Sequence, residues 1–192
     1  MKIDLLTLPA LQTAHWQIRS NAAQLFFDAY PVEDPELNME EKADGHERQL
    51  KVMLDLLRDD FPEIRTLAVT QVCKMVAKYW LVLSSNDINK LFNILVKELS
   101  CDSSSFRVRV AVVRGMSHIV KHCPRSHVYM KAVLKKFGRR LFDVNDTVRS
   151  AFLDLLATVK GVKLINFWDV VGVDEILAQV WPQTKTFSRA SL

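Results

Sequence analysis

The sequence predicts an all-α solenoid, an array of stacked antiparallel helix pairs, and three observations favour this fold class. An Ile-Arg or Val-Arg pair followed by apolar residues at helical spacing recurs four times along the 192 residues. Amphipathic segments with the same helical period lie between the copies. The chain also has only five glycines and six prolines, fewer than the many tight turns of an all-β fold require.

The recurring motif is predicted to begin the second helix of each repeat. With its arginine counted as position zero, positions −1, +3, +4 and +7 are apolar in every copy and share one helix face. Successive motif arginines lie 46, 44 and 40 residues apart. A period of about 40–47 residues with two helices per unit is typical of HEAT and armadillo repeats. The four motif arginines are Arg19, Arg65, Arg109 and Arg149.

Partner helices are predicted over 46–58, 87–99 and 126–142, each with apolar residues at helical spacing. Short acid-containing turns follow them, where Asp or Ser suits an N-cap and Pro62 suits a first helical turn. Neither end of the chain resembles the polar capping unit that a solenoid needs, so we expect one HEAT-repeat segment, 1–192, of a longer protein. Its repeats are predicted at about 1–31 (partial), 46–81, 86–123, 126–160 and 174–192 (partial), the last including Arg189.

Two interpretations of the motif arginines remain open. In the structural one, each guanidinium binds acids in the inter-helix turn of its own or the neighbouring repeat and sets the stacking register. In the functional one, the row of arginines lines a groove for an acidic partner. Nearby acids favour the structural interpretation, with Arg19 as the exception because no acid closely precedes it. The acids available to such pairs are Asp59, Asp60, Asp102, Asp143 and Asp146.

Charge is distributed unevenly along the chain. Residues 1–64 carry 6 basic and 13 acidic side chains, whereas residues 65–192 carry 20 basic and 9 acidic ones. The basic part suits an anionic partner. Within it, one helix is expected to gather five cations on the face opposite its apolar side, which predicts sequence-independent contact with the DNA backbone. This basic strip comprises Lys131, Lys135, Lys136, Arg139 and Arg140.

The sequence gives little support to other kinds of site. It has no phosphate-cradling glycine loop, nucleophile elbow or metalloprotease helix signature, so we expect neither an enzyme nor a bound cofactor. Three unpaired cysteines indicate reduced thiols, and no apolar run reaches the roughly 18 residues of a membrane span. A cluster of histidines and one cysteine lacks the spacing for tetrahedral zinc, so no metal site is predicted. The cluster consists of His118, His122, Cys123 and His127.

Several stretches resemble the HEAT-repeat G subunits of condensin II. They are W-Q-I-R-S-N-A-A-Q-L-F-F-D-A-Y-P-V-E-D-P, Q-V-C-K-M-V-A-K-Y-W, V-R-S-A-F-L-D-L-L-A-T-V-K and N-F-W-D-V. The similarity runs from about Trp16 to the end, and the first 15 residues do not fit it. The Ala-Tyr-Pro and Lys-Tyr-Trp stretches make the resemblance more specific than a repeat consensus alone.

The resemblance implies a non-enzymatic nuclear subunit acting on chromosomes. Such a subunit docks on the kleisin of a hetero-oligomeric complex, helps it engage DNA and supports mitotic chromosome condensation. ATP hydrolysis then belongs to the SMC ATPase heterodimer, and the kleisin-docking surface is not located. Two alternatives stay open: a nuclear-transport or phosphatase-type HEAT scaffold with a protein partner, and a HEAT-like DNA glycosylase. The glycosylase would need a catalytic acid and aromatic side chains facing a basic groove.

Overall fold

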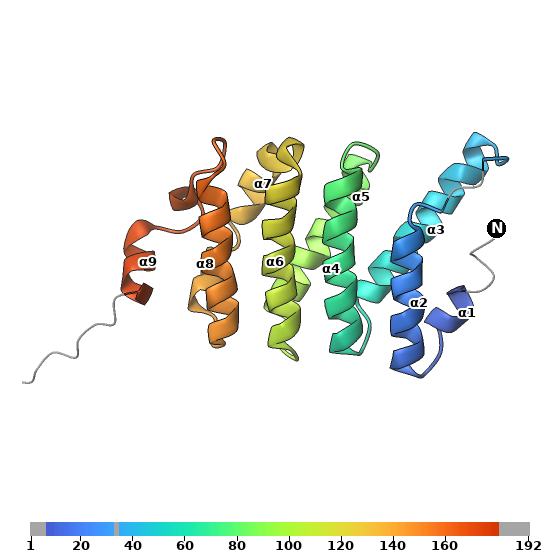
Figure 1. The fold of residues 1–192 in the computed structure, drawn as a ribbon, viewed down its shortest axis with the longest axis horizontal. Helices are drawn as coiled ribbons and strands as arrows, with labels where there is room; N and C mark the ends of the chain where they lie inside the picture. Colours follow the sequence, from blue (N-terminus) through green and yellow to red (C-terminus); the bar gives the residue numbers. More distant parts are fainter. Residues whose placement is uncertain (1–6, 33–34, 181–192) are drawn as a thin grey trace, which may run out of the picture.

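Helices α2, α4, α6 and α8 lie side by side and nearly parallel in one layer, and α3, α5 and α7 lie behind them in a second (Figure 1). The structure is a computed structural model that describes residues 7–32 and 35–180. These residues form helices and turns without a strand, so the predicted all-α solenoid is confirmed. None of the described helices is long and apolar enough to cross a membrane. The front helices are α2 (Trp16–Ala29), α4 (Pro62–Tyr79), α6 (Phe106–His122) and α8 (Asp146–Lys160).

The rear helices occupy the predicted positions but differ at their ends. Helix α3 begins well before residue 46 because Asn38 and Glu41 form a capping box, with both hydrogen bonds 3.0 Å long. Helix α5 continues through a π-helical turn, Ile94–Glu98, into a short 3-10 segment, Leu99–Cys101. Arg189 lies outside the described residues. The remaining helices are α1 (Thr7–Leu11), α3 (Met39–Leu57), α5 (Ser85–Asn93), α7 (His127–Leu134) and α9 (Val173–Val180).

The helix predicted over 126–142 is interrupted. Helix α7 ends at Leu134, and after a turn the chain forms a 3-10 segment, Gly138–Phe142. A Cβ on Gly138 would lie 2.7 Å from the carbonyl oxygen of Val170, so the segment after α8 packs directly on this backbone. Glycine also weakens a helix interior by about 1 kcal/mol relative to alanine. The expectation of one continuous amphipathic helix is therefore wrong, and its 100° spacing does not extend across the whole basic strip.

The apolar face of the motif forms the core between the two layers. The first copy is the least buried: Ile18, at position −1, is 46% exposed because the five-residue α1 covers only part of α2. The second and third copies follow the prediction closely. Their motif positions are all 0% exposed: Ile64, Ala68, Val69, Val72, Val108, Val112, Val113 and Met116.

Helices α4 and α6 approach each other closely at Gly115. A Cβ at this position would overlap the Sγ of Cys73 and lie 3.0 Å from its Cβ. Burial raises the pKa of the Cys73 thiol to about 12, so the thiol stays protonated at neutral pH. Only a residue without a side chain fits this contact, which fixes the spacing of α4 and α6.

Candidate interaction surfaces

Three of the four motif arginines bind an aspartate of the following repeat. Arg19 donates from Nε and Nη2 to the two carboxylate oxygens of Asp59, both at 2.9 Å. Arg109 holds Asp143 in the same bidentate way, with both distances 2.8 Å. Arg19 is thus no exception, since its acid follows it by 40 residues.

Arg65 varies this arrangement. Both its Nε and its Nη2 lie 2.9 Å from one oxygen of Asp102, and Nη2 also donates to the Ser104 hydroxyl. That hydroxyl in turn donates to the other carboxylate oxygen at 2.7 Å. The side chains of all three arginines are 11% exposed, and those of their aspartates only 5–12%. These are shielded ion pairs, unlike most surface salt bridges.

Each arginine also binds backbone carbonyls of the turn before its own helix. Arg65 Nη1 donates to the Asp59 carbonyl at 2.6 Å, and Arg109 Nη1 donates to the Asp102 carbonyl at 2.7 Å. Arg149 donates likewise to the Asp143 carbonyl at 2.7 Å, although no carboxylate among the described residues pairs with it. The contacts join into one hydrogen-bonded ladder running from repeat to repeat. This arginine ladder consists of Arg19, Asp59, Arg65, Asp102, Arg109, Asp143 and Arg149.

Backbone donors complete the carboxylate sites. Asp143 accepts the Asn145 N–H at 3.0 Å, and Asp102 accepts the Ser105 N–H at 2.9 Å. Burial alone would raise the pKa of Asp143. Hydrogen bonds from Arg109 and from the Asn145 backbone, with the charges of Arg109 and Arg140, instead hold this pKa below its usual range. The pKa of Asp102 is lowered in the same way. Burial would raise it, but hydrogen bonds and the charge of Arg65 outweigh the effect of burial.

Stability is expected to depend on these two carboxylates at low pH. Because the pKa values of Asp102 and Asp143 are lower in the folded chain than in the unfolded chain, their contribution is complete above about pH 4–5 and is lost as pH falls through the folded values. Urea unfolding at a series of pH values measures this slope. Asp143→Asn, which cannot titrate, should make the slope shallower, whereas Asp154→Asn, on the exposed face of α8, should not. An unchanged slope in Asp143→Asn contradicts the prediction.

The basic strip does not lie on one helix face. Lys135, Lys136 and Arg139 are exposed, in the turn after α7 and in the 3-10 segment. Arg140, by contrast, is 17% exposed and donates to the Ser100 carbonyl, with Asp143 at 3.8 Å. Lys131 lies 3.8 Å from Asp169. Two of the five predicted cations therefore lie near acids, and the other three are exposed and form no ion pair with a described acid.

A shallow pocket on the rear layer extends the exposed part of the strip. Lys136 borders it together with Lys90 and Lys97 of the preceding helical segment. Its wall includes Tyr129, whose hydroxyl donates to Asn89 at 2.8 Å. Apart from Lys90, which lies 4.0 Å from Asp87, these lysines have no ion pair within the described chain. The rear layer thus presents a basic, polar surface across two repeats.

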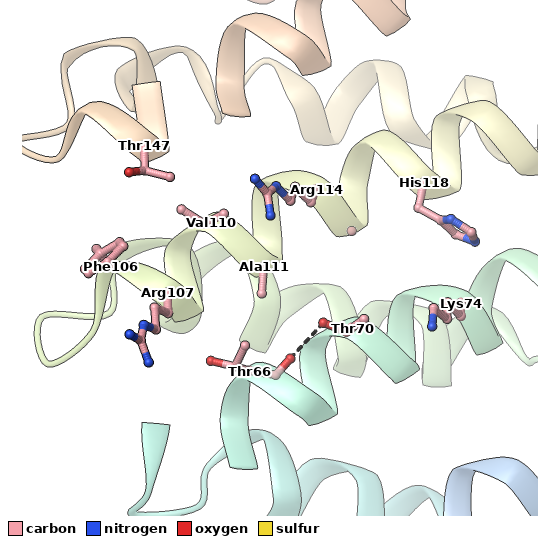
Figure 2. A pocket seen from close by; sticks show the side chains of 11 residues that line it. Thr66, Thr70, Lys74, Phe106, Arg107, Val110, Ala111, Arg114, His118 and Thr147 are labelled. Carbon is pink, nitrogen blue, oxygen red and sulfur yellow. Dashed lines mark hydrogen bonds between the residues drawn. The ribbon is translucent and has the colours of Figure 1, made fainter. Parts of the chain in front are cut away.

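A second basic surface lies on the front layer, in a groove between α4 and α6 (Figure 2). The groove has a volume of about 530 Å³. Val110 and Ala111, 7% and 8% exposed, form its floor beside Gly115. Phe106 stands at one end and is 39% exposed. The polar side chains around it are Thr66, Thr70, Lys74, Arg107, Arg114, His118 and Thr147.

The lining of this groove contains cations and no carboxylate. Lys74, Arg107 and Arg114 are exposed, and none forms an ion pair with any described residue. The pKa of His118 is lowered, first by burial and then by the charges of His122, Lys74 and Lys121. The neighbouring cations Lys74 and Lys121 thus add to the effect of burial on this imidazole.

The groove cations Lys74, Arg107 and Arg114 are not among the residues predicted from the sequence to bind a partner. A readable signal exists: residues 106–122 carry Arg107, Arg114 and Lys121 seven positions apart, and contain no acid. A spacing of seven repeats one helix face. The facing residue, Lys74, comes from another repeat and could be placed only by the structure.

The histidine and cysteine cluster does not converge. The rings of His118 and His122 have centroids 4.3 Å apart, but Nε2 of His127 is bound to the Val120 carbonyl at 2.8 Å and Cys123 is buried. Within residues 7–32 and 35–180, no group of three or more His, Cys, Asp or Glu side chains is arranged to hold a metal ion. The cluster is better described as the end of α6 and the turn after it.

Similar solved structures share the fold of this chain. A crystal structure of an engineered protein matches it with a TM-score of 0.57 and 15% identity, over 96% of this chain and 74% of the other. A second engineered protein matches with a TM-score of 0.55 and 14% identity, over 96% and 44%. At such low identity, these likenesses concern the fold alone.

Curated relatives confirm the resemblance to the G subunit of condensin II. Condensin-2 complex subunit G2 of Xenopus laevis is 32% identical over 179 residues, that of Homo sapiens 31% identical over 179, and that of Danio rerio 33% identical over 171. The alignments cover 93%, 93% and 89% of this chain but only 15%, 16% and 15% of those proteins. The chain thus spans about one sixth of the length of these relatives.

A family model also matches most of the chain, over residues 40–169. Its description names TPR repeats, whereas the spacing of 40–46 residues between motif arginines is closer to the HEAT period than to the 34 residues of a TPR unit. Both descriptions denote stacked helix pairs. The chain belongs to the helical-repeat family described as Dynein axonemal assembly factor 5-like, TPR repeats.

Proposed function

We propose that this chain is a segment of a condensin II subunit of the G type, a nuclear scaffold that helps the kleisin and SMC subunits engage chromosomal DNA. The observation that carries this proposal is similarity over nine tenths of the chain to condensin-2 complex subunit G2 from three vertebrates. The continuous ladder of ion pairs supports it, because a scaffold needs repeats held in a fixed register. Neither the transport-type scaffold nor the glycosylase has a comparable observation in its favour.

The proposed DNA contact lies on the rear layer, at the exposed part of the basic strip. Lys135, Lys136 and Arg139 are its centre, and Lys97 extends it across the shallow pocket. Lys131 and Arg140 are left out because each already lies near an acid. Exposed cations of this kind attract phosphates without reading base edges, so affinity should depend on salt and not on sequence.

Charge reversal at the strip tests the DNA contact. The double variant Lys135→Glu/Lys136→Glu is expected to raise the Kd for a 30-base-pair duplex about tenfold at low salt. The slope of log K against log salt should also fall by about two, because two phosphate contacts are removed. Fluorescence anisotropy at several salt concentrations, with two duplexes of unrelated sequence, measures both quantities.

A matched control separates local contact from overall charge. Lys160→Glu/Lys163→Glu makes the same change in net charge at exposed positions at and after the end of α8. This control should leave the Kd within about twofold of the original chain. Equal weakening by the two double variants, or none by either, contradicts a DNA contact at the strip.

Assembly with the kleisin is a separate experiment. A full-length version carrying this segment should recover the condensin II kleisin in a pull-down, and the ladder variant Asp143→Ala should recover less if the segment contributes to docking. Recovery of no kleisin by the full-length protein favours the transport-type or phosphatase-type scaffold. Excision of a base by the purified chain contradicts the scaffold proposal altogether.

A further inference from the structure

The arginines of helix α6 lie in two different environments. Arg109 is almost buried and donates three hydrogen bonds within the ladder, two to the Asp143 carboxylate and one to the Asp102 carbonyl. Arg107 and Arg114 point to the front surface, line the α4–α6 groove and have no acid partner among the described residues (Figure 2). The aspartates that pair with buried guanidinium groups, Asp59, Asp102 and Asp143, belong to the ladder and do not line the groove. The charge along the groove therefore remains available to another molecule.

The shape of the groove indicates what kind of molecule fits. Its floor is apolar and hollow because Ala111 and Gly115 are small and α4 lies close at Cys73. Its rims carry Lys74 on one side and the α6 arginines on the other. A sugar-phosphate backbone has no projecting apolar side chain to insert into such a floor. An extended peptide does, since it can insert one apolar side chain between carboxylates that reach the rims.

We propose that the α4–α6 groove binds an acidic, extended peptide segment of a partner protein. One apolar side chain of the peptide packs on Val110 and Ala111 beside Phe106. Its flanking carboxylates bind Lys74, Arg107 and Arg114. The threonine hydroxyls at positions 66 and 70 line the α4 wall beside the peptide backbone, although Thr66 and Thr70 also donate to carbonyls of their own helix. Charge complementarity selects acidic partners, and the small floor limits the anchor to one side chain.

This site is distinct from the DNA contact proposed above. The groove belongs to the front layer, whereas Lys135 and Lys136 follow α7 in the rear layer (Figure 1). A second copy of the chain is the main competing occupant, because residues 1–64 carry a net charge of −7. The two occupants differ in concentration dependence, so the experiment distinguishes them.

The test uses the 192-residue chain and two labelled 12-residue probes. One consists of Asp and Glu with a single central Phe, and the other has Ser in place of that Phe. The Phe probe should bind at least tenfold more tightly, because only it fills the apolar floor. Arg107→Glu/Arg114→Glu should weaken binding of the Phe probe at least tenfold, and Ala111→Trp, which fills the floor, should weaken it similarly.

A double variant with the same change in net charge serves as the control. Lys160→Glu/Lys163→Glu changes net charge by the same amount and should leave the affinity for the Phe probe within about twofold. The strip variant Lys135→Glu/Lys136→Glu should lose DNA and keep the probe, which separates failure of one site from failure of the other. No binding of the Phe probe at 1 mM overturns the proposal, as does equal affinity for both probes. Loss of DNA binding in the groove variant overturns it in favour of a nucleic acid, and self-association that this variant abolishes overturns it in favour of a second copy.

Discussion

Replacing Asp143 by alanine is expected to lower the free energy of unfolding by about 3 kcal/mol. The Asp143 side chain is 5% exposed and the Arg109 side chain 11%, so the substitution leaves a guanidinium shielded from water without its counter-charge. It also removes the acceptor of the Asn145 N–H at the start of α8. Urea unfolding followed by circular dichroism measures the change, provided that the dependence on urea is similar in both proteins.

An exposed pair of the same geometry serves as the control. Arg58 and Glu98 also form two hydrogen bonds, of 2.9 and 2.6 Å, and also join neighbouring repeats 40 residues apart. Their side chains, however, are 54% and 42% exposed. Glu98→Ala should therefore cost about 0.5 kcal/mol. If both substitutions lower the free energy of unfolding equally, shielding from water does not determine how much the arginine ladder stabilises the chain.

The ladder illustrates how far the sequence alone could go. The recurrence of arginine before an apolar helix face identified Arg19, Arg65, Arg109 and Arg149 as equivalent positions, because helical periodicity is local. The choice of acid was not local. The partners lie 34 to 40 residues later, in the next turn of the solenoid. Sequence proximity suggested that Arg19 had no acid, yet stacking brings Asp59 to it. The register-setting role of these contacts stays a prediction until the Asp143 variant is measured.

The basic strip shows where helical periodicity is insufficient. Its prediction assumed an unbroken α-helix, but Gly138 packs against the Val170 backbone and the helix ends before it. Lys131 and Arg140 then approach Asp169, at the end of a short 3-10 segment after α8, and Asp143, in the turn before α8, neither of which lies on the predicted helix 126–142. The groove could not be predicted from the sequence for a similar reason, because its two walls come from different repeats. Contacts made outside the single predicted helix, such as those of Lys131 with Asp169 and of Arg140 with Asp143, decide which cations stay available.

Replacing Gly115 by alanine is expected to lower the free energy of unfolding by about 2 kcal/mol. The helix propensity of alanine favours the change by about 1 kcal/mol. The added Cβ, however, overlaps the Sγ of Cys73, which is 0% exposed and packed on all sides, so α4 and α6 must move apart. The free-energy cost of this overpacking exceeds the free energy gained from the higher helix propensity of alanine. Urea unfolding of the variant measures the balance.

Gly45 provides the opposite case within the same chain. It lies inside α3, and a Cβ there meets no atom within 4 Å, so Gly45→Ala should stabilise the chain by about 0.5–1 kcal/mol. Cys73→Ala added to Gly115→Ala removes the overlapping sulfur and should recover about half of the loss, because the Cys73 Cβ remains 3.0 Å away. If Gly115→Ala stabilised the chain, α4 and α6 would have to separate easily, and the variant should bind the Phe probe as before. If the spacing of α4 and α6 is rigid, the free energy of unfolding and the affinity for the Phe probe should both fall.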